Sequence, residues 1–183
     1  MARGTLAGMD GSTNLRGSPT LRFRLLLTTA LLISSIGCDR ATKRLATDAL
    51  RGGPAIEMAG GVFRLQFAEN EGAFLSMGSR LPERLRFWVF TVGVAVVLGA
   101  VLITAVAKRG LTIMDIVSLA LVAGGGLGNW IDRVAGGRVV DFMNLGIGPV
   151  RTGIFNVADL AIVAGVVLMA LKRSKRSSAP SPG

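Results

Sequence analysis

Residues Phe87 to Ala107 form an apolar run that contains no charged side chain. A helix needs about 20 residues to cross the roughly 30 Å hydrocarbon layer of a bilayer, and this run is long enough. The run therefore predicts a membrane-spanning helix, which restricts the chain to the small set of folds that a membrane allows.

Three further apolar segments, Leu25–Cys38, Leu111–Ile131 and Phe155–Leu171, accompany this run. With helical continuation at their ends, the segments predict a mainly α, integral membrane fold with four transmembrane helices at about residues 22–41, 87–107, 111–131 and 155–171. Residues 21–171 would form one domain. The polar segments 1–20 and 172–183 lack apolar periodicity and predict disordered cytoplasmic tails.

Basic residues near the span ends predict the orientation. Arg22 and Arg24 precede the first span, Lys108 and Arg109 separate the second from the third, and a basic tail follows the fourth. The positive-inside rule places these ends and both termini in the cytoplasm, although the opposite connections also carry arginines. The formal charge of +10 fits anionic headgroups, and without a recognisable binding module we expect no nucleic-acid partner.

The connection between spans one and two contains a strand-like pattern. In residues 62–67, Phe63, Leu65 and Phe67 alternate with Arg64 and Gln66, the period of a half-buried strand. We expect a small extracytoplasmic sheet there, lying on the outer surface.

The chain contains no His and a single Cys, Cys38. These counts exclude Ser-His and Cys-His catalysis, His-ligated metal sites and an internal disulfide. Any hydrolysis must use carboxylates, Lys or Ser, and no cofactor or metal is implied.

The predicted topology collects polar residues at the outer ends of the spans. They are Asp39, Lys43, Asn70, Asn129, Asp132, Arg133, Asp141, Asn156 and Asp159. Ionisable groups at membrane depth are costly and mark function by default, although some of these could only anchor span ends at the headgroups.

Asp159 and Asp141 are the candidate catalytic residues. Asp159 lies one turn into an apolar helix, and Asp141 lies in a short β-type run before a Gly-rich turn that returns the chain to span four. Two neighbouring carboxyl groups share a proton, so that one activates water while the other polarises a carbonyl. The spacing of the two acids alone would be weak evidence for this chemistry.

Three local motifs favour structural roles. Thr112 and Asp115 have the spacing of a capping box, and Asp39 and Lys43 that of a helical ion pair. The Gly-rich run 124–128 would let another helix approach closely.

Five ordered motifs resemble the lipoprotein signal peptidases, the type II bacterial signal peptidases. They are Asp39-Arg-Ala-Thr-Lys43, Asn70-Glu-Gly-Ala-Phe74, Gly125-Gly-Leu-Gly-Asn129 with Trp-Ile-Asp-Arg133, Val139-Val-Asp-Phe142 and Phe155-Asn-Val-Ala-Asp159. The resemblance covers roughly residues 22–172. It implies a four-span inner-membrane aspartic endopeptidase that cuts prolipoproteins on the amino side of a diacylglyceryl-modified cysteine.

Carried over by position, the resemblance makes Asp141 and Asp159 the catalytic pair. The residues that would bind substrate or support the site are Asp39, Lys43, Asn70, Gly72, Asn129, Asp132, Arg133 and Asn156. The partners would be diacylglyceryl-modified prolipoproteins and membrane lipid. Arg40 departs from the Gln usual in the family, and the N-terminal extension is not explained by the family pattern.

Two other interpretations remain open at this point. A basic stretch, an apolar run and Ser35-Ile-Gly-Cys38 resemble a lipobox, which would make the chain a lipoprotein lipidated at Cys38. Alternatively, Asp141 and Asp159 could bind a proton or cation in an ion-coupled carrier.

Overall fold

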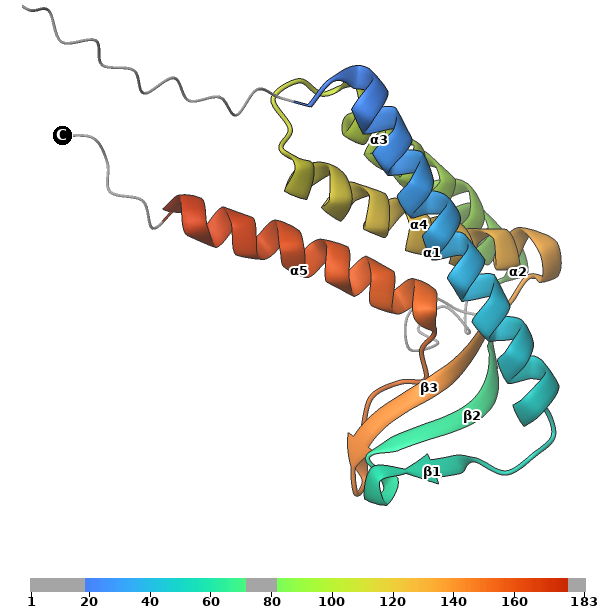
Figure 1. Cartoon of the computed structure of the whole chain (residues 1–183). Coiled ribbons are helices and arrows are strands. Elements are labelled where there is room, and N and C mark those ends of the chain that lie inside the picture. Colours follow the sequence, from blue (N-terminus) through green and yellow to red (C-terminus); the bar gives the residue numbers. More distant parts are fainter. Residues whose placement is uncertain (1–18, 72–81, 178–183) are drawn as a thin grey trace, which may run out of the picture.

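The structure, a computed structural model, describes residues 19–71 and 82–177. Its elements, in chain order, are α1 (Leu21–Leu50), β1 (Ile56–Met58), a 3-10 turn η1 (Ala59–Gly61), β2 (Phe63–Asn70), α2 (Glu83–Phe87), a π-helical turn η3 (Trp88–Gly93), α3 (Val94–Ala107), α4 (Ile113–Gly136), β3 (Val139–Ile147), β4 (Val150–Arg151) and α5 (Val157–Ser177). The long helices form a bundle, and the sheet covers one end of it (Figure 1).

Three helices in the described part of the chain are long and apolar enough to cross a membrane: Leu21–Leu50, the continuous helix Glu83–Ala107, and Ile113–Gly136. The helix Glu83–Ala107 turns apolar side chains outward, with Val96, Val97 and Ile103 each more than half exposed. Such surfaces suit lipid rather than water. The chain is a multi-pass membrane protein.

The helices run beyond several of the predicted span ends. The predicted first span ended at about residue 41, but α1 continues to Leu50. Within this longer helix, Asp39 and Lys43 form a buried ion pair. Of the predicted disordered tails at 1–20 and 172–183, residues 1–18 and 178–183 lie outside the described residues, and residues 172–177 are the end of α5 rather than a disordered segment.

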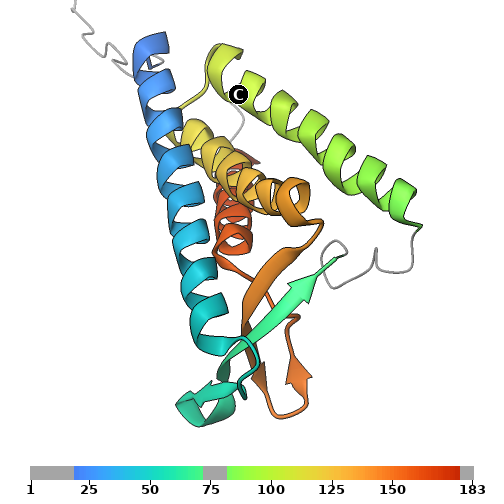
Figure 2. The same ribbon diagram turned by 90° about the vertical axis from the view of Figure 1, so that its right-hand side faces the viewer.

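Helix α4 is at the centre of the helical bundle and packs against α1, α3 and α5. Its glycines permit this packing, as the sequence predicts: a Cβ on Gly124 would lie 2.8 Å from the Ser35 Cβ of α1. A Cβ on Gly128 would lie 2.8 Å from the Asp39 carboxylate, also of α1. Helix α3 meets the others near its C-terminal end and diverges toward α2 (Figure 2).

Polar contacts join the helix ends on the side away from the sheet. Arg24 donates to the carbonyl oxygens of Ala105 (2.6 Å) and Lys108 (2.7 Å), which satisfies the end of α3. The predicted capping box is confirmed at the start of α4. The Thr112 side chain accepts a hydrogen bond from the Asp115 backbone N–H, and the Asp115 side chain accepts one from the Thr112 backbone N–H. Lys172 of α5 donates to Thr112 at 2.8 Å.

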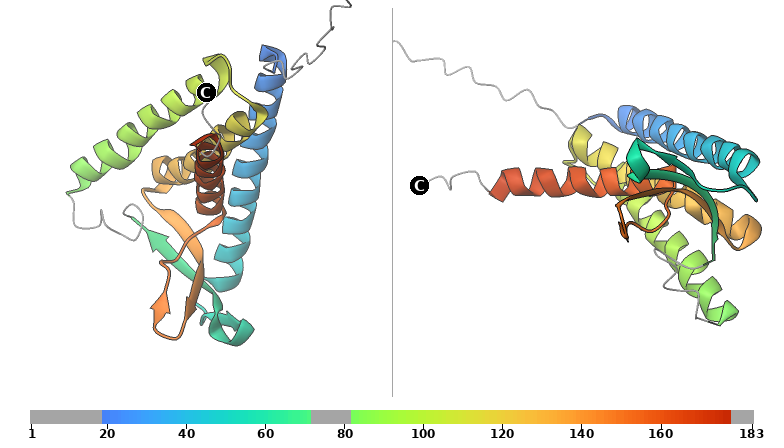
Figure 3. Two further views of the ribbon diagram at one scale, coloured as in Figure 1. Left: turned by 90° about the vertical axis from the view of Figure 1, so that its left-hand side faces the viewer. Right: turned by 90° about the horizontal axis from the view of Figure 1, so that it is seen from below.

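The sheet has the antiparallel order β1-β2-β3-β4. The predicted strand after residue 62 is confirmed as β2, but the sheet is not built from the first connection alone. Strands β3 and β4 come from the connection between α4 and α5, and β2 pairs with β3 in a register that sets Ala68 opposite Asp141. The sheet curves across the ends of α1 and α5 (Figure 3).

A small apolar core fixes the sheet to α1. Ala46 and Leu50 on the last turns of α1 pack against Phe142 of β3, with Leu65 and Phe67 of β2 beside them. Gly137, with φ of 70°, caps the end of α4 and turns the chain directly into β3. Together these features place the middle of β3 against the end of the helical bundle, in contact with α1 and α4.

Candidate active site

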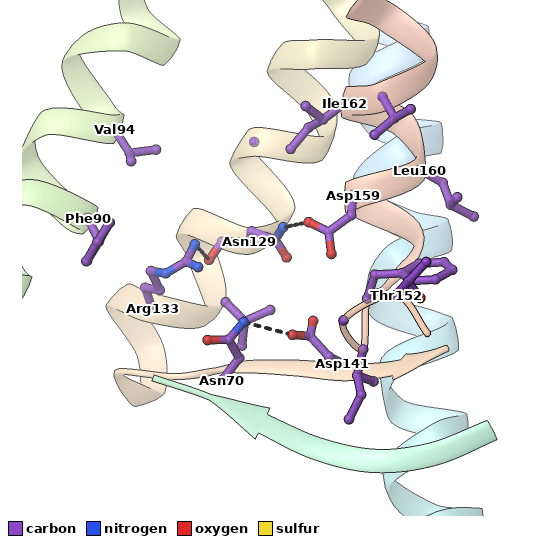
Figure 4. Close-up of a pocket in the computed structure, with 16 residues that line it drawn as sticks. Asn70, Phe90, Val94, Asn129, Arg133, Asp141, Thr152, Asp159, Leu160 and Ile162 are labelled. Atoms are coloured by element: carbon purple, nitrogen blue, oxygen red, sulfur yellow. Dashed lines mark hydrogen bonds between the residues drawn. The ribbon is translucent and has the colours of Figure 1, made fainter. Parts of the chain in front are cut away.

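A pocket of about 480 Å³ lies between the Glu83–Ala107 helix, α4, β3 and α5. Its polar end carries five of the residues singled out in the sequence: Asn70, Asn129, Arg133, Asp141 and Asp159. Asn70 is the last residue of β2, and Asn129 and Arg133 lie in the last turns of α4. Asp141 comes from β3, and Asp159 from the first turn of α5. The carboxyl groups of Asp141 and Asp159 face each other across this polar end (Figure 4).

Asp141 enters the pocket from β3 and is 3% exposed. Its Oδ2 accepts a hydrogen bond from the Asn70 amide at 3.0 Å, and its Oδ1 accepts one from the Asn156 amide at 2.6 Å. Burial raises the pKa of Asp141 to about 6, and the charge of Asp159 adds to the rise. The two amide bonds act in the opposite direction, because they stabilise the ionised form.

Asp159 is held at the start of α5 by a reciprocal cap. The Asp159 N–H donates to Asn156 Oδ1 at 3.0 Å, and the Asn156 N–H donates to Asp159 Oδ2 at 3.1 Å. This is the geometry of a capping box, with Asn as the N-cap and an acid three residues on. The other carboxylate oxygen, Oδ1, accepts from the Asn129 amide at 2.8 Å.

Asn156 joins the two acids. Its side chain is fully buried, and its oxygen is bound to the Asp159 N–H while its nitrogen donates to Asp141. The same nitrogen lies 3.0 Å from Asn129 Oδ1. These partners fix the amide in one orientation, because only its nitrogen can donate.

A buried ion cluster lies behind this polar end and reaches it through Asn129. Lys43 Nζ donates to Asp39 at 2.7 Å, to Asp132 at 2.7 Å and to Asn129 Oδ1 at 2.9 Å. Asp39 Oδ1 accepts from the backbone N–H of Ala158 at 3.0 Å, so the cluster also holds the first turn of α5. The predicted helical pair of Asp39 and Lys43 is therefore present, and its contacts extend over three helices.

Arg133 brings a positive charge to the pocket and donates to the Asn129 carbonyl at 3.4 Å. Arg40, the departure from the family pattern, lies 3.4 Å from Asp132 and adds a second cation beside that carboxylate. Gly72 lies outside the described residues. The sequence did not single out the apolar side of the pocket, which includes Phe90, Val94 and Leu160.

The polar end of the pocket has the groups needed for water-mediated hydrolysis. A carboxylate can take a proton from water while a protonated neighbour donates to a carbonyl. An Asp with a pKa near 6 has a substantial population of both forms close to neutral pH. The fixed amides hold the two carboxyl groups in place without competing for the role of acid or base.

Comparison with known proteins gives a consistent family. Residues 31–174 match the profile of the family described as signal peptidase (SPase) II. A lipoprotein signal peptidase from Sphingopyxis alaskensis is 38% identical over 156 residues, covering 83% of this chain and 85% of that protein. One from Geobacter sulfurreducens is 35% identical over 153 residues, covering 82% and 94% respectively.

A solved structure described as a bacterial membrane enzyme shares the fold with a TM-score of 0.72 at 25% identity, covering 91% of this chain and 96% of that one. A second, also described as a bacterial membrane enzyme, gives a TM-score of 0.68 at 25% identity, covering 85% and 95%. With the family profile matched over residues 31–174, this chain belongs to the signal peptidase II family.

Proposed function

We propose that this protease removes signal peptides from prolipoproteins by an aspartic mechanism, cutting on the amino side of a diacylglyceryl-modified cysteine. Asp141 and Asp159 are the catalytic pair. The observation that carries the proposal is the arrangement of these two carboxyl groups, which line one pocket. Both accept a hydrogen bond from Asn156, Asp141 from its side chain and Asp159 from its backbone N–H. The family, whose relatives are named lipoprotein signal peptidases, supports the substrate class.

The mechanism follows from a shared proton. Burial and the charge of Asp159 raise the pKa of Asp141 to about 6, so the pair holds one proton in about half of the molecules at pH 6 and in about a tenth of them at pH 7. The ionised member takes a proton from a water molecule, which attacks the scissile carbonyl, while the protonated member donates to the carbonyl oxygen. As the C–N bond breaks, the carboxyl group that took the proton from water passes it to the leaving amine. A hydroxyl of the tetrahedral intermediate returns a proton to the other carboxylate, which restores the pair. Asn129, Asn70 and Asn156 keep the carboxyl groups oriented through these steps.

The apolar side of the pocket suits the lipid of the substrate. Phe90 and Val94 line it from one helix, and Leu160, Ile162 and Val163 line it from α5. These residues lead from the two acids along helices whose outer faces are apolar. Acyl chains lying in this part of the pocket would hold the modified cysteine beside the carboxyl groups.

The proposal includes a topology of four spans in the bacterial inner membrane, with α5 as the fourth. The basic ends support it: Arg24 binds the end of α3, and Lys172 binds the start of α4, so four helix ends meet on one side. That side and both termini are cytoplasmic, and the acids at the opposite ends face the outer surface. Residues 21–171 are then the peptidase domain, between cytoplasmic tails at 1–20 and 172–183.

The test is cleavage of a diacylglyceryl-modified prolipoprotein by the purified protein. Asp141→Asn and Asp159→Asn should each lower kcat by at least about 100-fold, the usual loss when an acid or base is removed. Asp48→Asn is the matched control, because this acid of α1 is exposed and outside the pocket. Folded variants that kept near wild-type turnover would refute the pair, and loss of wild-type activity with metal chelators would refute the metal-free mechanism.

A further inference from the structure

The helix opposite the two acids is interrupted where it borders the pocket. Between α2 and α3, residues Trp88–Gly93 form a π-helical turn. Such turns are rare, are often found at functional sites, and alter the direction of the side chains around them. Phe90 lies within this turn and Val94 directly after it, and both line the pocket. The shape of this pocket wall therefore depends on the irregular turn.

Trp130 of α4 binds the turn through its main chain. The indole Nε1 donates to the Thr91 carbonyl oxygen at 2.8 Å, and the Val94 N–H donates to the same oxygen. In an apolar membrane layer, a carbonyl or an indole N–H without a partner is costly. The bond thus satisfies the indole N–H, gives the Thr91 carbonyl oxygen a second donor, and holds the turn against α4.

A second contact lies one helical turn earlier on α4. Gly126 faces Leu98 of α3 so closely that a Cβ at this position would collide with the leucine side chain. The two helices are therefore fixed at Leu98 by close packing and at Thr91 by the Trp130 hydrogen bond. Phe90 and Val94 form the pocket wall next to these two contacts.

We propose that Trp130 is a positioning residue for recognition of the substrate's acyl chains: by holding the π-helical turn, it sets the place of Phe90 and so the width of the apolar side of the pocket. This inference rests on the proposed function, which supplies the diacylglyceryl ligand. It adds a residue that determines how well lipids of different chain length are held, separately from the chemistry at the two acids.

The first test compares Trp130→Phe with Trp88→Phe. The first change removes the indole N–H and keeps an aromatic ring. Trp88→Phe is the matched control, because Trp88 begins the same turn but is 62% exposed and does not line the pocket. Two lipopeptides that differ only in carrying dipalmitoyl or dioctanoyl glyceryl groups are the substrates. Trp130→Phe should raise KM for the dipalmitoyl substrate about three- to ten-fold, the effect of one hydrogen bond, with kcat nearly unchanged. The dioctanoyl substrate, which fills less of the wall, should be affected less.

Phe90→Ala tests the same pocket wall directly, because Phe90 lines the pocket. It should also raise KM selectively for the longer chains, and the double variant should lose less than the product of the two single effects, because both act through one contact surface. Equal KM changes for the two lipids, a loss confined to kcat, or multiplicative effects would each overturn the proposal. Melting temperatures identify any variant that fails to fold.

Fluorescence separates this inference from the proposed function. The chain has two tryptophans, so Trp88→Phe combined with Asp159→Asn leaves Trp130 as the reporter in a protein that should bind without cleaving. We expect its emission to change on titration with the dipalmitoyl lipopeptide, with weaker binding of the dioctanoyl form. If the wild type cleaved neither lipopeptide but this titration held, the proposed function would fail and the lipid site would stand. Cleavage without any Trp130 response would reject the lipid role of Trp130.

Discussion

Two opposing influences set the pKa of Asp141. Burial and the neighbouring Asp159 raise its pKa, while hydrogen bonds from Asn70 and Asn156 lower it, and the result is a pKa of about 6. The balance keeps both protonation states available near neutrality. The amide donors therefore have an electrostatic role in addition to orienting the carboxyl group.

Asn70→Ala should shift the pH dependence of cleavage. Removing this donor takes away an interaction that favours the ionised carboxylate, so the pKa of Asp141 should rise further above its ordinary value. The limb of the profile of kcat/KM that reports Asp141, expected near pH 6, should move to higher pH. Asn144→Ala is the control, since this buried amide of β3 contacts Arg151 and Thr152 rather than the acids. An unshifted or downward-shifted limb in Asn70→Ala would contradict the assignment.

Helix α4 organises the elements around it because its glycine face admits α1 and α5. Gly128→Ala should lower the melting temperature and the activity together, since the new Cβ would lie 2.8 Å from Asp39 Oδ2 and push on the buried ion cluster. The cost expected from such overpacking is about 1–3 kcal/mol. Gly136→Ala in the same helix is the control, because a Cβ there meets nothing within 4 Å. Equal melting temperatures for the two variants would show that α1 can move away freely.

Arg24 links the start of α1 to the end of α3. Arg24→Gln should destabilise the protein by about 1–3 kcal/mol, because the Ala105 and Lys108 carbonyls would lose a charged donor. The exposed Arg22 provides the matched substitution, Arg22→Gln, which should have little effect. Thermal unfolding in detergent micelles measures the difference, and similar losses for both variants would argue against the capping role.

The sequence predicts those elements that depend on local patterns. The charge-free run at Phe87–Ala107 and the capping box at Thr112 carry their own signal within a few turns of chain, and both are confirmed. The contacts of Lys43 with Asn129 and Asp132 join distant segments and leave no periodic trace. The pairing of β2 with β3 also joins distant segments, and the sequence therefore predicted a sheet only within the connection between spans one and two.

The irregular parts of the site are harder still to predict. The π-helical turn around Phe90 occurs within a uniformly apolar run, so no change of period announces it. Trp130, which binds this turn, stands in a motif noted in the sequence, but nothing in that motif indicates a contact with Thr91. The polar end of the pocket was predictable from its chemistry, because acids and amides are rare in such segments. Its apolar wall was not.

At the scale of the whole molecule, the proposed topology can be tested with fusions. Alkaline phosphatase joined after residue 183 should be inactive, and joined after Gly53 it should be active, because the enzyme matures only outside the cytoplasm. A fluorescent protein that folds only in the cytoplasm should give the reverse result. An active phosphatase at the C-terminus would mean an odd number of spans and would remove α5 from the membrane.

The pairing of β2 with β3 also bears on biogenesis. Asn70 is made early, Asp141 reaches it only after α4 has been inserted, and Asp159 follows on the last helix. A nascent or prematurely terminated chain therefore lacks one or both acids, however well its first helices have entered the bilayer. If Asp141 and Asp159 are the proposed catalytic pair, proteolytic competence begins only when translation is nearly finished.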